Sequence, residues 1–348
     1  MRRPRYPGKN PRRFHEKYKE LNPERYAADV QKVLASGKTP AGMHRPIMVE
    51  EVLRCLRPAP GDVAVDCTLG GGGHARAILE RVQPGGRLIG IDADPIELPK
   101  TERRLRDAGC GPETFSAHVG NFAGLPKILA AEGLERADII LADLGVSSMQ
   151  LDNPDRGFSH KAAGPLDMRM NPTRGATAAQ LVARLSELAL AMLLEEHADE
   201  PDAPLIASLL KRPLPGDKAH TTATVDAVIR EGLGVAHPRL TREEATASVR
   251  RTFQALRIAV NDEFATLDAL LRSLPQCLAP RGRVAILSFH SGEDRRVKKA
   301  FQSGLRDGIY AAVADDVIRA TPEEQRANPR SASAKLRWAV RSPEVQGA

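Results

Sequence analysis

Cysteine is scarce in this sequence, and the few cysteines that occur show no paired spacing. They stand at Cys55, Cys67, Cys110 and Cys277. A disulfide framework or a zinc site needs cysteines at short, repeated spacings. The sequence therefore predicts neither disulfide bonds nor a metal site, and a reducing cytoplasm is the expected location.

Long apolar runs are also missing. A helix that crosses a bilayer needs about 18 or more consecutive apolar residues, and the basic start of the chain is not followed by the apolar stretch of a secretory signal. We therefore expect a soluble protein with no membrane partner. With 348 residues, of which 42% are hydrophobic and 27% charged, the chain is long enough for one large or two modest domains.

Acidic residues are outnumbered only at the N-terminus. The net charge is +7, and residues 1–40 hold eleven Lys or Arg against four Asp or Glu, whereas the rest of the chain is balanced. The excess therefore belongs to a basic N-terminal extension at residues 1–40. Its basic residues are interleaved with aromatic ones, so it can follow phosphates and stack on bases. A solvated tail is an equally good interpretation.

The most informative stretch is residues 62–94. An apolar run ends at Asp66, glycines occupy positions 70–73, a helical pattern opens at His74, and a second apolar run ends at Asp92. Glycines let backbone N–H groups approach a ligand, and an acid that ends the second strand can accept both hydroxyls of a ribose. A glycine-rich turn alone can be only a tight turn. With an acid on each side, the pattern favours a nucleoside cofactor, and S-adenosylmethionine fits better than NAD.

Strand and helix patterns alternate from residue 62 to residue 144, which predicts a parallel sheet with its ligands at the carboxyl ends of the strands. The third predicted strand ends beside Phe122, the fourth ends at Asp143, and a further strand at residues 283–290 ends at His290. Phe122 can flank an adenine ring or simply pack in the core.

A helical pattern replaces this alternation in the middle of the chain. Capping boxes begin at Thr177 and Thr241, and the second predicts one long helix that reaches Leu274. We therefore predict an α/β Rossmann-like sheet formed by residues 41–149 and 248–348, with an all-helical domain inserted at residues 150–247.

Residues 150–175 are predicted to form a long loop before these helices. Such a loop is uncommon unless it is functional or disordered. It carries Arg156, Phe158 and Arg169, and together with Arg257 these are candidate RNA contacts because guanidinium and aromatic groups suit phosphates and bases.

Eight motifs follow one another from residue 68 to residue 337. They are TLGGGGHA (68–75), IDAD (91–94), DLGVSSMQLD (143–152), RGFS (156–159), GPLDMRMN (164–171), FQALRIAVN (253–261), SFHSGEDRRVK (288–298) and NPRSASAKLR (328–337). In sequence and order they resemble the ribosomal RNA small-subunit methyltransferase H family. The resemblance implies an S-adenosylmethionine-dependent enzyme that methylates N4 of a cytidine in 16S rRNA, with an α/β methyltransferase fold and a helical insertion that helps bind RNA.

The resemblance also implies which residues hold the cofactor. By motif position they are Gly72, Gly73, His74, Asp92, Phe122, Asp143 and Gln150. Asp143 and His290 are the two candidates for accepting a proton from the cytosine amine. Asp143 is equally well interpreted as a cofactor ligand only, and His290 as a residue that orients a loop.

The sequence leaves two other functions open. One is an amino-methyltransferase that acts on DNA, although no Pro-Pro-aromatic sequence follows Asp143. The other is a cofactor-binding assembly factor that clamps immature rRNA. The expected partner is 16S rRNA in the small ribosomal subunit, and the target base is expected to be single-stranded or flipped out. The sequence does not determine the oligomeric state or the assembly stage.

Overall fold

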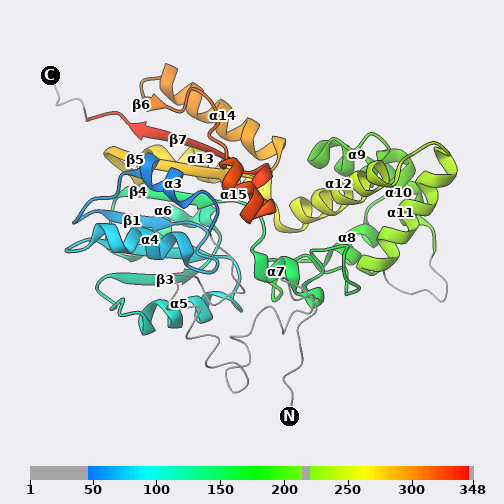
Figure 1. Cartoon of the computed structure of the whole chain (residues 1–348), viewed down its shortest axis with the longest axis horizontal. Coiled ribbons are helices and arrows are strands. Elements are labelled where there is room, and N and C mark those ends of the chain that lie inside the picture. The colour runs from blue at the N-terminus through cyan, green and yellow to red at the C-terminus, as the bar shows by residue number, and fades with distance from the viewer. Residues whose placement is uncertain (1–45, 214–219, 345–348) are drawn as a thin grey trace, which may run out of the picture.

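The computed structural model describes residues 46–213 and 220–344 and consists of an α/β lobe and a helical lobe (Figure 1). The α/β lobe is built on a seven-stranded sheet with the order β3-β2-β1-β4-β5-β7-β6. The strands are β1 (Val63–Asp66), β2 (Arg87–Asp92), β3 (Phe115–Val119), β4 (Ala137–Asp143), β5 (Leu278–Ser288), β6 (Tyr310–Val313) and β7 (Lys335–Arg341). The pairings among β1 to β5 are parallel, and β7 runs antiparallel to β5 and β6. The predicted α/β sheet with a helical insertion is confirmed.

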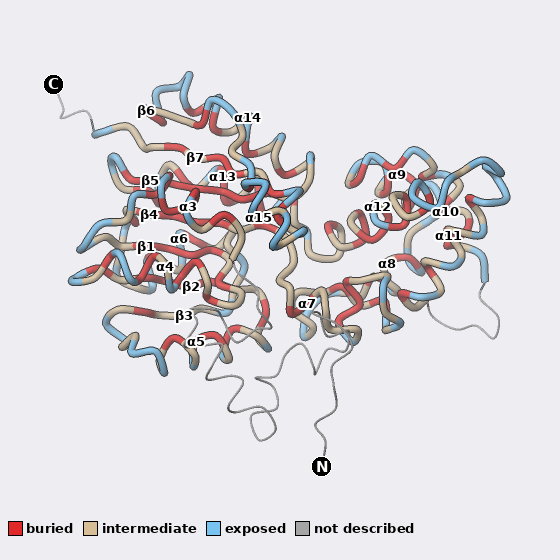
Figure 2. Tube along the Cα trace, in the orientation of Figure 1, coloured by how far each residue is buried: buried red, intermediate tan, exposed pale blue. Residues whose placement is uncertain are grey.

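Both faces of the sheet are covered, as its near-continuous apolar strands require. In β4, Ile139 and Leu141 face one hydrophobic cluster, while Ile140 and Ala142 face the other. The first cluster includes α3 (Val49–Leu56), α4 (Gly73–Val82) and α5 (Leu98–Asp107), and the second includes α6 (Leu125–Ala131), α13 (Glu263–Cys277) and α14 (Ser291–Arg306). Figure 2 shows the buried strands between these layers.

The helical lobe has a hydrophobic core of its own. Its helices are α8 (Ala178–Arg184), α9 (Glu187–Ala198), α10 (Ala203–Lys211), α11 (Thr222–Ala236) and α12 (Arg242–Asn261). Both predicted capping boxes are present, at Thr177 and Thr241. The core continues along α12 to Leu256, so the predicted boundary at residue 247 falls inside a continuous helix of this lobe.

The prediction of one helix from Thr241 to Leu274 is wrong. Asp262 adopts a left-handed conformation with φ of 50°, and its N–H donates to the Ile258 carbonyl, which ends α12. A new helix, α13, starts at the next residue and packs on the sheet instead. The apolar spacing runs through both helices, so the hydrophobic pattern alone does not reveal the break that redirects the chain between the lobes.

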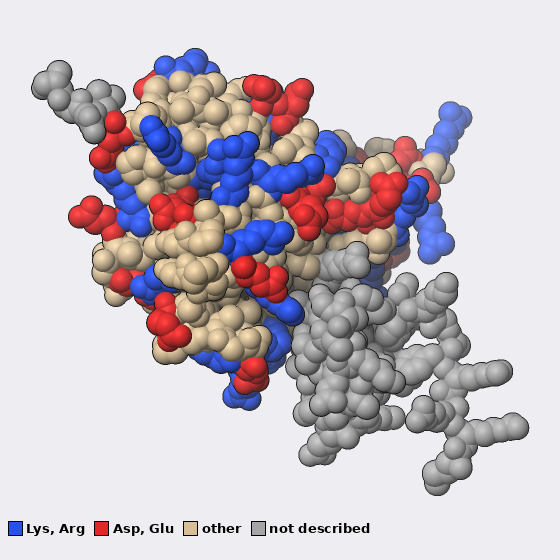
Figure 3. All heavy atoms as spheres, turned by 60° about the vertical axis from the view of Figure 1, so that its left-hand side comes forward, with Lys and Arg blue, Asp and Glu red and all other residues tan. Residues whose placement is uncertain are grey.

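Short elements complete the described chain. They are α7 (Ser148–Asp152), α15 (Pro322–Ala327), η2 (Phe122–Gly124), η3 (Pro154–Arg156) and η4 (Pro329–Ser333). Within the described ranges, no helix is both long enough and apolar enough to span a bilayer. On the face in Figure 3, basic and acidic side chains alternate over the α/β lobe. The predicted basic extension at residues 1–40 lies outside the described residues.

Replacing a core residue of β4 tests this packing. Ile140 is fully buried, and we expect Ile140→Ala to lower the free energy of unfolding by about 2–5 kcal/mol because it leaves a cavity. Ile96→Ala is the control, since Ile96 is 44% exposed and its loss should change stability by about 0.5 kcal/mol or less. Urea unfolding can be followed by the fluorescence of Trp338, the single tryptophan, in β7. Equal midpoints for the two variants would contradict the assignment of β4 to the core.

Candidate functional site

A cleft of about 640 Å³ opens where the parallel strands end and the helical lobe begins. Its lining includes the residues that follow β1 to β5 and, from α12, Arg250, Phe253 and Gln254. This is the edge at which open parallel sheets bind ligands. Of the residues singled out from the sequence, the lining contains Gly73, His74, Asp92, Phe122, Asp143, Gln150, Phe158 and Arg257. Gly72, Arg156, Arg169 and His290 lie outside this lining.

The glycine-rich loop is held against the end of β2. One carboxylate oxygen of Asp92 accepts from the Gly70 N–H at 2.7 Å, and the other accepts from the Asp94 N–H at 2.8 Å. Gly72 has φ of +76°, and a Cβ there would lie 2.9 Å from Thr101 Cγ2. A Cβ on Gly73 would overlap the Pro46 ring. Glycine is therefore required at both positions for the loop to pack this closely.

Three carboxyl groups at the strand ends resist ionisation. Burial raises the pKa of Asp66 to about 7 and the pKa of Asp92 to about 6. Burial, reinforced by the nearby charges of Asp66 and Glu293, raises the pKa of Asp143 to about 8. Each group would be easier to ionise next to a positive charge. The strand ends therefore favour a cationic ligand.

Asp143 has an oxygen left over for such a ligand. Its Oδ1 is buried and has no hydrogen-bond partner among the described residues, although 27% of the side chain is exposed. Its Oδ2 lies 3.7 Å from His74 Nδ1. The Ile47 carbonyl accepts from His74 Nε2 at 3.0 Å, and burial lowers the pKa of His74 to about 4, so the imidazole is neutral at pH 7. His74 therefore lies beside Asp143 without supplying a charge.

Asp94, two residues beyond Asp92, connects the end of β2 to the segment that leads into the helical lobe. Its side chain is buried, and Oδ2 accepts from Gln150 Nε2 at 2.8 Å and from Arg156 Nη1 at 2.7 Å. Arg156 Nη2 also donates to the carbonyls of Arg169 and Met170, at 3.0 and 2.9 Å. We call Asp94, Gln150 and Arg156 the Asp94 network.

This network bears on two of the residues suggested for RNA binding. Arg156 is only 8% exposed, and its guanidinium is surrounded by the protein groups just described. Arg169 forms a two-point ion pair with Asp167, at 2.8 Å from Nε and 2.7 Å from Nη2. Both guanidinium groups are therefore held by oxygens of the protein, and the prediction that they contact RNA stays a prediction.

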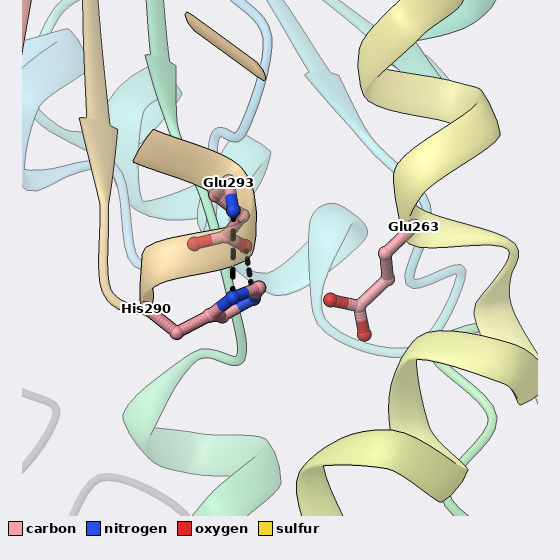
Figure 4. Close-up of side chains that lie close together, drawn as sticks. All are labelled: Glu263, His290 and Glu293. Atoms are coloured by element: carbon pink, nitrogen blue, oxygen red, sulfur yellow. Dashed lines mark hydrogen bonds and ion pairs between the residues drawn. The ribbon is translucent and has the colours of Figure 1, made fainter. Parts of the chain in front are cut away.

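A polar cluster lies at the end of β5 (Figure 4). His290 caps α14, because its Nδ1 accepts from the Glu293 N–H at 3.4 Å, and its Nε2 lies 3.2 Å from Glu293 Oε1. Glu263 points toward this pair from the start of α13 and receives Arg257 Nε and Nη2, each at 2.8 Å. His290 also packs against the ring of Phe264, at 5.7 Å between centroids.

Within this cluster, Glu293 borders the cleft and is held in the ionised form. Burial opposes its ionisation, but the nearby His290, the charge of Arg257 and the Phe289 N–H outweigh burial and lower the pKa of Glu293. Glu263, His290 and Glu293 bring possible metal ligands within 4.8 Å of one another. Arg257 nevertheless occupies both oxygens of Glu263, and its charge opposes a metal cation there.

Asp94 and Glu293 border or support the site but are not among the site residues that the sequence predicts. Both lie inside the motifs IDAD and SFHSGEDRRVK, where an acid beside a strand end is a usable signal. The same is true of Arg330 of η4 in one respect: it is not among the predicted site residues, yet it lines the cleft and pairs with Asp152 Oδ1 at 2.7 Å. That contact joins segments 178 residues apart, so no local sequence pattern predicts it.

Removing the Arg156 guanidinium tests the Asp94 network. We expect Arg156→Met to cost about 3–5 kcal/mol of stability, because it leaves the Asp94 carboxylate buried without its charge partner. Titration with S-adenosylmethionine, the cofactor expected from the sequence, should also show weaker binding, since Asp94 adjoins Asp92. Arg174→Met removes an exposed charge from the same segment and is the control. Unchanged melting temperature and affinity in Arg156→Met would show that the network has no such role.

Comparisons with known proteins place this chain in a family. The family model described as the MraW methylase family matches residues 41–342. Ribosomal RNA small subunit methyltransferase H 2 of Alkaliphilus metalliredigens is 47% identical over 343 residues, which cover 98% of each chain. Ribosomal RNA small subunit methyltransferase H 1 of Lachnoclostridium phytofermentans is 46% identical over 342 residues, which cover 98% of this chain and 93% of the relative.

Similarity to solved structures is much lower. An rRNA methylase from Streptococcus thermophilus aligns with 84% of this chain and 93% of its own, with 10% identity and a TM-score of 0.39, which supports no conclusion about function. The sequence relatives are decisive, because they match almost the whole chain at nearly half of its positions. The chain belongs to the MraW methylase family.

Proposed function

We propose that this chain is an S-adenosylmethionine-dependent methyltransferase that methylates the N4 amino group of a cytidine in the 16S rRNA of the small ribosomal subunit. The observation that carries the proposal is the cleft at the carboxyl ends of β1 to β5, whose acidic strand ends suit a cationic nucleoside cofactor. Full-length relatives named as small-subunit rRNA methyltransferases support the choice of substrate. Such a substrate would be met in the cytoplasm.

The residues that border the cleft fit the cofactor. Asp92 ends β2, where an acid can bind a ribose, and Gly71 and Gly73 of the adjoining loop line the same cleft. The partnerless oxygen of Asp143 suits a positively charged group. Phe122 lines the same cleft and can flank an adenine ring. When bound, S-adenosylmethionine supplies an electrophilic methyl group attached to a cationic sulfur.

The protein must position the cytosine amine and accept one of its protons. The amine is a poor nucleophile because its lone pair is delocalised into the ring, so a nearby carboxylate assists its reaction. Asp143 borders the cleft, but its pKa of about 8 leaves it largely protonated at pH 7 until a cation is bound. Glu293 borders the same cleft and is already ionised. We therefore assign cofactor binding to Asp143 first, and Glu293 joins it as a candidate proton acceptor.

His290 fits a positioning role better than direct proton transfer. Its Nδ1 is occupied by the cap of α14, and its Nε2 faces Glu293. Since His290 lies outside the cleft lining, its imidazole would act through Glu293, by holding that carboxylate in place and keeping it ionised.

Cofactor affinity should depend on pH. The pKa values of Asp92, Asp66 and Asp143 are raised to about 6, 7 and 8, and a bound cation favours their ionised forms. Affinity for S-adenosylmethionine should therefore rise between pH 6 and pH 7.5, with release of protons on binding. Above that range the amino group of the cofactor begins to lose its own charge, at about pH 8.

Asp143→Asn isolates one of these carboxyl groups. We expect it to weaken binding at pH 7.5 and to reduce the pH dependence by about tenfold per pH unit, the effect of one proton. Calorimetry in two buffers of different ionisation enthalpy would measure the protons released. Asp316→Asn, at an exposed position, is the control. An affinity that falls with pH in the wild-type protein would contradict the proposed electrostatics.

The reaction itself is tested by transfer of labelled methyl groups. The wild-type protein should label small ribosomal subunits or 16S rRNA, and mass analysis should identify N4-methylcytidine, which should be absent from rRNA of a deletion strain. Glu293→Gln should retain cofactor binding and lose most of the transfer rate, by about 10²-fold or more, if Glu293 is the proton acceptor. A persistent mark in the deletion strain would refute the proposed function, and full activity of Glu293→Gln would refute only the role of Glu293.

A further inference from the structure

A second hollow lies in the helical lobe, apart from the strand ends. It has a volume of about 600 Å³, within the range of small-ligand sites. It is lined from α11, from the start of α12 and from the loop at residues 160–161, and its polar lining includes His160, Lys161, Asp226, Arg230 and Arg242. We call it the α11–α12 hollow.

The hollow adjoins the cleft. His160 and Lys161 border both cavities, so the two share a wall. The His160 ring also packs edge-on against Phe253 of the cleft lining, at 5.7 Å between centroids. The two cavities therefore lie next to each other at His160 and Lys161.

The charges in the hollow favour an anion. Lys161, Arg230 and Arg242 are set against a single carboxylate, Asp226. Asp226 is committed to protein groups, since its two oxygens lie 2.8 Å from Arg230 Nε and 3.1 Å from His160 Nδ1. Lys161 and Arg242 are both exposed. The hollow thus presents two accessible cations that the internal ion pair does not neutralise.

The wall residue His160 offers a polar contact of a different kind. Burial lowers its pKa, against the opposing effect of Asp226, so the imidazole is neutral at pH 7. With Nδ1 directed to Asp226, the proton sits on Nδ1, and Nε2 is left as an acceptor. A neutral imidazole in a hollow that also holds two exposed cations suits a nucleotide, which carries base or sugar donors beside a phosphate.

We propose that the α11–α12 hollow binds a nucleotide that adjoins the target in the RNA strand, with Lys161 and Arg242 contacting its phosphate. The proposal rests on the proposed function, since an RNA substrate is what gives the target a neighbour. The target base must leave its stack to reach the cleft. A site for the next nucleotide holds the strand in that splayed form and fixes which base is presented.

A double variant tests the hollow. Lys161→Gln/Arg242→Gln removes two exposed charges without touching the core of the helical lobe or the cofactor residues. We expect its affinity for a single-stranded RNA of roughly ten nucleotides centred on cytidine to fall about tenfold at low salt, and the slope of log affinity against log salt to shrink by about 1. Affinity for S-adenosylmethionine should be unchanged.

The control removes the same charge elsewhere. Arg103→Gln/Lys127→Gln changes two exposed residues on α5 and α6 of the α/β lobe. If the two double variants bind RNA equally well, the hollow is not a subsite and the proposal is overturned.

Modified RNA locates the contact. Phosphates on either side of the target can be replaced one at a time by uncharged methylphosphonates. At one position the wild-type protein should lose affinity while Lys161→Gln/Arg242→Gln loses none, because the two changes remove the same contact. Equal losses for both proteins at every position would overturn the proposal.

The outcome is separable from that of the proposed function. RNA binding that weakens in the double variant, in a protein that transfers no methyl group, would support the hollow and refute the methyltransferase proposal. If the wild-type protein methylates normally and the double variant binds RNA as well as the control does, the methyltransferase proposal is supported and the nucleotide site in the hollow is refuted.

Discussion

The buried carboxylate of Asp94 is the constraint on which the arrangement of the site depends. A charge that is 1% exposed must be compensated, and here Arg156 and Gln150 compensate it from the loop that follows β4. The same guanidinium holds the backbone at residues 169 and 170. The end of the strand that carries Asp92 is thereby tied to the entrance of the helical lobe, and the sheet edge and the helical lobe cannot shift independently without breaking this ion pair.

The carboxyl groups that border the cleft are in electrostatic environments different from that of Asp94. Asp94 is satisfied internally, but Asp143 is not: burial raises its pKa, neutral His74 gives it no charge, and Oδ1 is left without a partner in the described part of the chain. Glu293, by contrast, is held in the ionised form by His290 and Arg257. Two carboxyl groups whose pKa values are driven apart can take different roles, one that ionises with a bound cation and one that is a base from the outset.

The sequence predicted the sheet and the acids at its strand ends better than it predicted the contacts of the loop after β4. Strand-end acids such as Asp92 and Asp143 are local features, because a parallel sheet gathers its strand ends at one edge whatever the details of packing. The ion pair of Arg156 is not a local feature. Its place in a polar loop predicts an RNA contact, but the fold pairs its guanidinium with Asp94, 62 residues away. A sequence shows that an arginine is present, but its partner depends on tertiary structure.

The helix break at Asp262 is a backbone feature that the sequence pattern also fails to predict. It explains the position of the cleft. Apolar residues continue at helical spacing from α12 into α13, since both helices bury one face, yet the two faces belong to different cores. One left-handed residue is enough to change direction, and aspartate tolerates that conformation better than most residues. The turn sets Arg257 and Glu263, on either side of it, beside Glu293, which follows the end of β5. The bend that separates the lobes thus also supplies the polar groups that border the cleft between them.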